Sequence, residues 1–268
     1  MLLGLHHVTA LAGDPQANLD YYTQVLGLRL VKRTVNFDDP GSYHFYFGDP
    51  SGRPGTLLTF FPGFHRQMRR GAGQAVSVTY AGPAVTGSKP DPDGLDLQLV
   101  QAESPALHSI ALCEREIEPT AAFLEMLGFR HLDTQGNRHG FDLASGRARI
   151  DVLHEPETER GKLGAGAIHH IAFRVADEAT QLDWRDRLLS AGVRVSPVKD
   201  RAYFHSIYFR EPGGVLFEIA TDGPGFLIDE PADALGTSLC LPPWLKPSRE
   251  SIQARLPPIH LSEYSRIL

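Results

Sequence analysis

Three segments of the chain open alike, and this repeat limits the fold more than any other feature of the sequence. The segments are 5–9 (LHHVT), 107–111 (LHSIA) and 168–172 (IHHIA). Each has His after an apolar first residue and Val or Ile at its fourth position, and each is too short to form a fold alone. Recurrence of such an opening indicates that one supersecondary unit is repeated along the chain and that neighbouring units bury a shared core.

The residues that follow each opening define the rest of the unit. Stretches with apolar residues at intervals of three and four predict a helix with one buried face, and each ends at a glycine suited to a left-handed cap. Alternating apolar residues then predict half-buried strands, separated by turns such as DPSG and EPGG. The unit is therefore predicted as strand, helix and three strands. The helices are expected at 19–27, 120–128 and 182–192, and strands at 43–47, 56–60, 206–209 and 215–219.

A fourth unit is expected in abbreviated form between the first and the second full ones. Residues 76–79 and 91–100 predict strands, but the Pro- and Gly-containing segment 83–90 leaves no room for a helix. The predicted fold is α+β, with repeated βαβββ modules forming curved mixed sheets. In sequence order the chain divides into an N-terminal module pair at 1–102 (1–65 full, 72–102 abbreviated), a C-terminal pair at 103–225 (103–160 and 164–225), and a Pro-rich tail at 226–268.

The missing helix has a consequence for assembly. An apolar sheet face around Val76, Val78, Leu97 and Leu99 would be left uncovered, and bare apolar patches of several hundred Å² are unusual on monomers. The Pro-rich tail or a second copy of the chain would then cover it. We therefore expect a homo-oligomer.

Side chains that meet inside the sheet predict a metal site. Since successive strand residues face opposite sides, Phe217 would pack on the helices and Glu218 would face the hollow. The same reasoning turns His7 and His170 into the hollow and sends His6 and His169 towards the helices. Two imidazoles and one carboxylate form a facial triad, which non-haem Fe(II) commonly occupies and Mn(II) can share.

A lone histidine on a strand is more often a core or surface group than a ligand. A repeated His-His pair with an inward glutamate at the end of the same unit favours ligation. The third unit has Ser109 at the ligand position, and the first has Thr59 where the last has Glu218. One metal site per chain is therefore expected, with His6 and His169 behind the ligands or in contact with the substrate.

Composition excludes several classes of partner. The 268 residues carry a formal net charge of -6, which argues against nucleic-acid binding because phosphate contacts require clustered positive charge. Cys113 and Cys240 are the two cysteines, too few and too far apart for a disulfide framework. No signal peptide or membrane-spanning segment is apparent, so the cytoplasm is the expected location and no membrane partner is expected.

The repeated unit, with histidine on its first strand and glutamate on its last, resembles the vicinal oxygen chelate superfamily of glyoxalases, bleomycin-resistance proteins and extradiol dioxygenases. More narrowly, residues 199–221 (KDRAYFHSIYFREPGGVLFEIAT) resemble bacterial hydroquinone ring-cleaving dioxygenases, as do GLHHVT at 4–9 and GPGF at 223–226. The resemblance implies an Fe(II) triad of His7, His170 and Glu218, and a small aromatic substrate that reacts with O2. It also implies that Arg201 and Tyr208 contact the substrate and stabilise an oxyanion, and that His6 or His169 moves a proton.

Three other functions remain open at this level. A catechol extradiol dioxygenase would use the same triad and differ in the placement of the ring hydroxyls. A glyoxalase-like isomerase or transferase usually has four protein ligands, whereas three are visible here. A binding protein of the bleomycin-resistance type would not need two histidines and a glutamate in one hollow.

Overall fold

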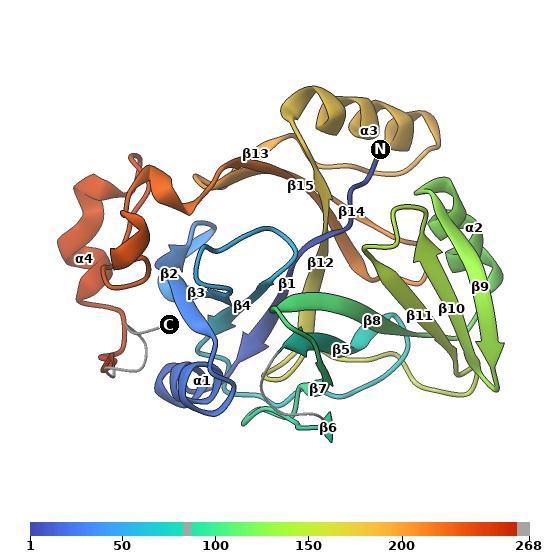
Figure 1. The fold of residues 1–268 in the computed structure, drawn as a ribbon, viewed down its shortest axis with the longest axis horizontal. Helices are drawn as coiled ribbons and strands as arrows, with labels where there is room; N and C mark the ends of the chain where they lie inside the picture. Colours follow the sequence, from blue (N-terminus) through green and yellow to red (C-terminus); the bar gives the residue numbers. More distant parts are fainter. Residues whose placement is uncertain (83–86, 262–268) are drawn as a thin grey trace.

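Each of the four units contributes strands to one of two curved sheets (Figure 1). The computed structural model describes residues 1–82 and 87–261. The first unit comprises β1 (Leu5–Ala12), α1 (Pro15–Asp20), the π-helix η1 (Tyr21–Val25), β2 (Arg29–Asn36), β3 (Asp39–Gly48) and β4 (Leu57–Pro62). The second comprises β5 (Gln74–Gly82), β6 (Gly87–Ser88) and β7 (Asp96–Gln101).

The third and fourth units are full, as expected. The third comprises β8 (Ala106–Glu114), α2 (Glu118–Met126), β9 (Phe129–Gln135), β10 (Arg138–Leu143) and β11 (Arg149–His154). The fourth comprises β12 (Ile168–Val175), α3 (Glu178–Ser190), β13 (Lys199–Asp200), β14 (Phe204–Arg210) and β15 (Leu216–Pro224). Short helices follow in the tail: η2 (Phe226–Ile228), η3 (Ala232–Ala234), η4 (Lys246–Ser248) and α4 (Arg249–Gln253).

The predicted helix ends and strands are confirmed. Gly27, Gly128 and Gly192 follow the three helical stretches with φ of 66°, 96° and 79°, the left-handed conformation that a glycine cap supplies. Of the segment 83–90, residues 83–86 lie outside the described residues. The remainder contains the short strand β6 and no helix, so the second unit is abbreviated as predicted.

The sheets join units that are distant in the sequence. One sheet has the order β13-β14-β15-β12-β1-β4-β3-β2, and the other has the order β6-β7-β5-β8-β11-β10-β9. The first unit thus shares a sheet with the fourth, and the second with the third. Each sheet therefore combines one unit from residues 1–102 with one unit from residues 103–225. The antiparallel pairing of β1 with β12 lies at the centre of the larger sheet and brings the two His-His segments side by side.

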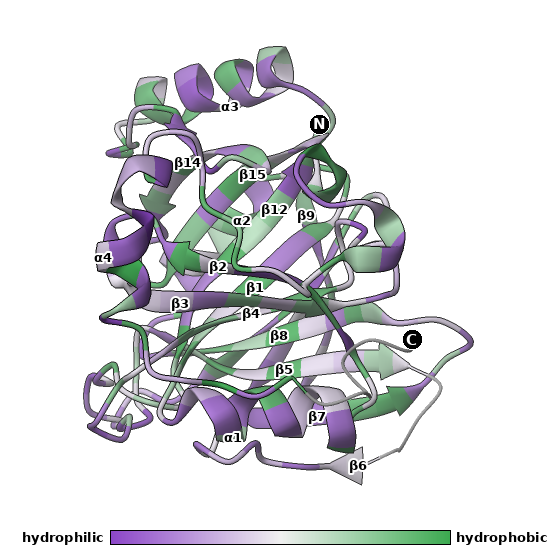
Figure 2. Ribbon diagram, turned by 90° about the vertical axis from the view of Figure 1, so that its left-hand side faces the viewer, coloured by the Kyte–Doolittle hydropathy of each residue, from purple (hydrophilic) through white to green (hydrophobic). Residues whose placement is uncertain are grey.

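A continuous core covers the faces of both sheets that point away from their hollows. Val8, Ile171 and Phe217 from the larger sheet belong to the same apolar cluster as Ile110 and Val152 from the smaller one. The strands carry long hydrophobic stretches, while α1, α3 and α4 at the periphery carry many hydrophilic segments (Figure 2). The predicted alternation in β15, with Phe217 packed and Glu218 in the hollow, is confirmed.

The face expected to lie bare is covered within a single chain. Val78 and Leu97 are 0% exposed, and they share the core cluster with Leu19 and Tyr22 of the first unit. Val76 was assigned to this face incorrectly. A register shift between Ala75 and Ser77 turns it to the opposite side, where it packs against Ala111 and Cys113. The reason given for expecting an oligomer is therefore removed.

The tail packs along the edge of the larger sheet, beside β2 (Figure 1). The backbone N–H of Cys240 donates to the carbonyl of Arg33 over 2.9 Å, and the buried Lys32 ammonium lies 2.5 Å from carboxylate oxygens of both Asp229 and Glu230. In the part of the chain that the structure describes, no helix is both long and apolar enough to cross a membrane.

Candidate metal centre and active site

Three strands bring the predicted ligands together. In the register of the larger sheet, His7 on β1 stands opposite Ala172 on β12, and Glu218 on β15 stands beside the same Ala172. The Nε2 atoms of His7 and His170 are 3.2 Å apart. The Oε2 atom of Glu218 lies 3.5 Å from His7 Nε2 and 3.0 Å from His170 Nε2. All three side chains are buried.

This donor set fits a divalent transition-metal ion. Ligand atoms about 2.1 Å from a common ion and at right angles to one another lie about 3.0 Å apart, close to the observed separations. The Oε2 atom of Glu218 is buried without a hydrogen-bond partner, and such an orphaned carboxylate oxygen requires a cation or a donor. Within the described residues, no fourth His, Cys, Asp or Glu joins this group.

Each ligand histidine is oriented by the histidine before it. His6 Nδ1 lies 2.9 Å from His7 Nδ1, and His6 Nε2 lies 3.2 Å from the carbonyl of Thr221. A carbonyl only accepts, so the hydrogen of neutral His6 is assigned to Nε2 and His7 must donate from Nδ1. The lone pair of His7 is thereby left on Nε2, the atom that faces Glu218. Burial is the main reason that the pKa of His6 is lowered to about 3, which keeps it neutral.

The second His-His pair repeats this contact. His169 Nδ1 lies 2.8 Å from His170 Nδ1, and burial, followed by the neighbouring His170, lowers the pKa of His169 to about 3. His6 and His169 were expected to face the helices. Instead their rings turn back to their neighbours, and a register shift between Leu5 and His7 leaves His6 unpaired in the ladder.

Glu218 is held as a carboxylate. Ser206 donates a hydrogen bond to its Oε1 atom from the neighbouring strand β14. Burial opposes ionisation of Glu218, but the neighbouring His7 and His170 hold its pKa well below the usual value. The arrangement therefore offers one negative charge and two neutral nitrogen donors to an ion.

A pocket of about 360 Å³ opens beside this group, and His7 and His170 form part of its wall. Aromatic and apolar side chains form much of its wall, and polar groups gather near the ligands and at the mouth. Its volume suits one small aromatic ring with its substituents. The apolar lining comprises Leu11, Phe37, Tyr46, Phe61, Phe64, Phe204 and Leu216, and the remaining residues include Asp38, Asp39, His44, His169, Arg201 and Tyr208.

Tyr208 and Arg201 both line this pocket, and they contact each other. Arg201 Nε donates to Tyr208 Oη over 3.0 Å, so the hydroxyl hydrogen of Tyr208 remains available for a ligand. Burial raises the pKa of Tyr208, which keeps the hydroxyl protonated. Arg201 Nη2 also lies 2.9 Å from Asp38 Oδ2. Burial opposes the charged form of Arg201, but Tyr208 and Asp38 raise its pKa.

His44 and Tyr46 are among the pocket residues that were not predicted from the sequence. His44 is buried on β3, with Nε2 3.0 Å from Thr59 Oγ1, and its ring centroid is 4.0 Å from that of Tyr46. Burial, with His7 and His170 nearby, lowers the pKa of His44 well below its usual value. The alternation of β3 could have identified both residues, because Tyr43, Phe45 and Phe47 all belong to the outer core.

The hollow of the smaller sheet has equivalent positions without histidines. Ser77 stands opposite Ala111 as His7 stands opposite Ala172, and Ser109 replaces His170 as predicted. Asp151 occupies the position of Glu218, which sequence reasoning had not noticed. Its carboxylate accepts from Arg149 Nε and Arg138 Nη1, each over 2.9 Å. Guanidinium groups thus neutralise the carboxylate at the position that Glu218 occupies in the larger sheet.

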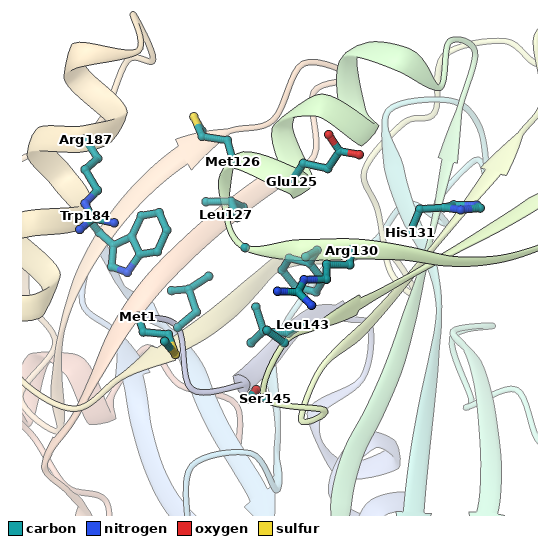
Figure 3. Close-up of a pocket in the computed structure, with 14 residues that line it drawn as sticks. Met1, Glu125, Met126, Leu127, Arg130, His131, Leu143, Ser145, Trp184 and Arg187 are labelled. Atoms are coloured by element: carbon teal, nitrogen blue, oxygen red, sulfur yellow. The ribbon is translucent and has the colours of Figure 1, made fainter.

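Two other features offer less chemistry. A cavity of about 720 Å³ lies between α2, α3 and the N-terminal residues, where Trp184, Met126 and Met1 face one another (Figure 3). It contains no convergent set of metal donors among the described residues. Asp229, Glu230 and Cys240 do converge, but the Lys32 ammonium lies among them and provides the cation.

Comparison with known proteins decides the family. The family model described as "Glyoxalase/Bleomycin resistance protein/Dioxygenase superfamily" matches residues 4–86 and 106–219, which is more than half of the chain. The chain belongs to this superfamily. The repeated fold and the resemblance inferred from the sequence are thereby confirmed.

Members of the superfamily resemble the chain over nearly its whole length. MhqO of Bacillus subtilis (strain 168), provisionally named a ring-cleaving dioxygenase, is 38% identical over 97% of this chain and 98% of its own. The chlorohydroquinone/hydroquinone 1,2-dioxygenase of Sphingobium indicum is 31% identical over 93% and 94%. A crystal structure of a provisionally named dioxygenase from Bacillus subtilis superimposes with a TM-score of 0.91, at 38% identity and over 97% and 98% of the two chains.

Proposed function

We propose that this superfamily member is an Fe(II)-dependent ring-cleaving dioxygenase that inserts O2 into a hydroquinone-type ring, with Mn(II) as the alternative ion. The main support is the convergence of His7 Nε2, His170 Nε2 and Glu218 Oε2, 3.0 to 3.5 Å apart, beside an aromatic pocket of about 360 Å³. A ligand set of two histidines and one carboxylate leaves coordination positions open for a ring oxygen and for O2. The names of the relatives point to the same reaction class.

When bound, the ion would supply the redox chemistry that joins the ring and O2. His7, His170 and Glu218 would hold it, while His6 and His169 keep the lone pairs of their neighbours on Nε2. The Tyr208 hydroxyl would donate to a ring oxygen, and the Arg201 guanidinium would supply positive charge where an oxyanion develops. His169 lines the pocket, and its Nε2–H would remain available to donate or relay a proton.

The three-ligand set also bears on the alternatives. At the position where a fourth ligand would come from the first unit, Thr59 accepts or donates hydrogen bonds with Thr9 and His44 over 2.7 and 3.0 Å. Those contacts satisfy the hydroxyl and disfavour a four-ligand site of the glyoxalase kind. The cytoplasm remains the expected location.

Anaerobic reconstitution tests the proposal. Protein loaded with Fe(II) or Mn(II) would be mixed with O2 and hydroquinone, methylhydroquinone or catechol, and O2 uptake recorded. We expect about one O2 consumed per hydroquinone and no uptake by the His7→Ala variant. His108→Ala is the matched control, because this exposed residue occupies the slot of His169 in the third unit. No uptake with any hydroquinone would contradict the proposal, and uptake with catechol alone would contradict its substrate.

A further inference from the structure

An ion pair spans the mouth of the pocket between units that are distant in the sequence. Asp38 lies in the two-residue turn between β2 and β3, in the first unit, and Arg201 follows β13 in the fourth. The Asp38 backbone N–H donates to Asn36 Oδ1 over 3.0 Å, which shapes the turn. Arg201 Nη2 and Asp38 Oδ2 are 2.9 Å apart, and the Arg201 side chain is 17% exposed.

Two nitrogen atoms of the Arg201 guanidinium already have protein partners. Its Nε atom donates to Tyr208 Oη, and its Nη2 atom is paired with Asp38. Among the described residues that line the pocket, Arg201 is the one lysine or arginine, whereas Asp38 and Asp39 supply two carboxylates at the mouth. The charge at the mouth is therefore net negative, and the cation is already neutralised by a protein group.

We propose that Asp38 is a specificity-determining residue that reserves the pocket for uncharged hydroquinone rings and excludes rings bearing a carboxylate. The inference rests on the proposed function and adds the class of ring substituent that the site accepts. A charged substituent would have to displace Asp38 from Arg201 or enter an aromatic wall formed by Phe37, Phe61 and Phe204 without a partner. The first route brings another negative charge to a mouth that is already net negative, and the second leaves a charge in an apolar wall.

The ion pair contributes little to the stability of the fold, so its removal should change ligand binding without unfolding the protein. Asp38 carries its carboxylate on an exposed side chain, 61% accessible, so the Asp38→Asn variant should fold normally. Removing its charge would free Nη2 of Arg201. The Nη1 and Nη2 groups could then pair with a carboxylate through two parallel hydrogen bonds. The freed guanidinium would then favour the substituent that the wild-type protein rejects.

Equilibrium binding without turnover tests this inference. The ligands would be 2,5-dihydroxyphenylacetate and 2,5-dihydroxyphenylacetamide, which match in shape and differ in charge. In both, a methylene joins the carboxylate or amide to the ring and keeps it away from the ring oxygens that would contact the ion. Binding to the Zn(II)-loaded protein would be measured by calorimetry without O2. We expect the wild type to bind the amide at least about tenfold more tightly, and Asp38→Asn to reduce this preference about tenfold or more.

Two further variants separate the ion pair from overall charge. Asp39→Asn removes the same charge from the same hairpin, but Asp39 forms no ion pair among the described residues. It should change the preference less than about threefold, as expected for a screened rim charge. Asp38→Glu should restore the wild-type preference. Equal binding of both ligands by the wild type, or an unchanged preference in Asp38→Asn, would overturn the inference. If the wild type binds hydroquinone itself but neither ligand, the inference fails, and if it does not bind hydroquinone either, the proposed function fails.

Discussion

At the scale of single residues, the two His-His pairs show how neighbours in the sequence can divide one task. The second histidine of each pair presents Nε2 to the centre, and the first contacts its Nδ1 atom over 2.8 to 2.9 Å. This contact selects the tautomer and fixes the ring, which raises the basicity of the donor atom. In the proposed metal centre, the first histidines would therefore orient the ligands without being ligands.

Replacing His6 should weaken metal binding without removing a ligand. A His6→Leu variant loses the acceptor for His7 Nδ1, so the His7 ring is free to rotate or to protonate Nε2. Groups that orient ligands typically contribute a factor of about 10 to 100 in metal affinity. Equilibrium dialysis against Mn(II) or Zn(II) would measure the loss, with His108→Leu as the control. Equal affinities in His6→Leu and in the wild type would show that the pair does not orient His7.

Tyr208 should affect turnover and not metal content. Its hydroxyl lies outside the donor set but in the same pocket. Removing a donor that stabilises developing negative charge typically lowers kcat by about 10² or more. Tyr208→Phe should therefore retain its ion, measured by elemental analysis, and lose most of its O2 uptake with hydroquinones. A variant that turns over like the wild type would make the role of Tyr208 structural.

At the scale of elements, buried charges connect segments that pack on each other. Lys32 on β2 is 0% exposed and pairs with Asp229 and Glu230 of the tail, and Tyr203 Oη donates to Asp229 over 2.9 Å. Tyr203 is two residues from Arg201 and follows Ala202, whose φ of 64° is unusual for a residue with a Cβ atom. The tail thus supports the turn that carries Arg201 into the pocket.

Lys32→Met should destabilise the fold strongly. Removing one partner of a buried ion pair leaves an uncompensated charge, which typically lowers the free energy of unfolding by about 3–5 kcal/mol. Urea or thermal unfolding would measure this loss. Lys246→Met, an exposed residue of the same tail, is the matched control and should change the free energy of unfolding by less than about 0.5 kcal/mol. A similar small effect for both variants would mean that the tail is held by its apolar contacts alone.

Glu114, at the end of β8, should make stability depend on pH. It packs against Gly213 in the turn before β15, and its Oε1 atom has no hydrogen-bond partner. Burial, followed by the nearby Glu211, raises the pKa of Glu114 to about 8. A raised carboxyl pKa means that the folded state holds its proton longer than the unfolded state does. Stability is therefore lost as the pH rises from about 4.5 to about 8.

In the Glu114→Gln variant, this contribution to the loss of stability at rising pH should be absent. Its side chain stays neutral at every pH, so between pH 5 and pH 8 it should lose about 1–2 kcal/mol less stability than the wild type does. Urea unfolding at the two pH values would measure the difference. Glu116→Gln, at an exposed neighbour, should follow the wild type. Parallel curves for Glu114→Gln and the wild type would contradict the assignment.

At the scale of the whole molecule, two related sheets differ in what neutralises the acidic group in their hollows. In the larger sheet Glu218 faces two histidines, and in the smaller one the equivalent Asp151 is paired with Arg138 and Arg149. Ser77 and Ser109 stand where the other sheet has His7 and His170. The second hollow is therefore electrically satisfied without an ion.

One ion per chain is the expected stoichiometry. Protein loaded anaerobically with Fe(II) or Mn(II) and freed of excess metal should retain about one equivalent, because a stable site needs three converging donors. Elemental analysis would measure it, with a His7→Ala, His170→Ala double variant expected to retain none. Two tightly held equivalents, or an ion retained by the double variant, would contradict the assignment. Light scattering would test the homo-oligomer, which remains a prediction.

The sequence alone determined the repeated unit and the direction of most side chains on their strands, with Val76, His6 and His169 as exceptions. The 3.6-residue and 2-residue periods are local properties of a chain, so the helices, the strands and the triad of His7, His170 and Glu218 could be predicted from them. Only the tertiary structure decided which units share a sheet, because that choice depends on packing between whole units. The contact of Asp38 with Arg201, 163 positions along the chain, follows from that pairing, and no local pattern specifies it.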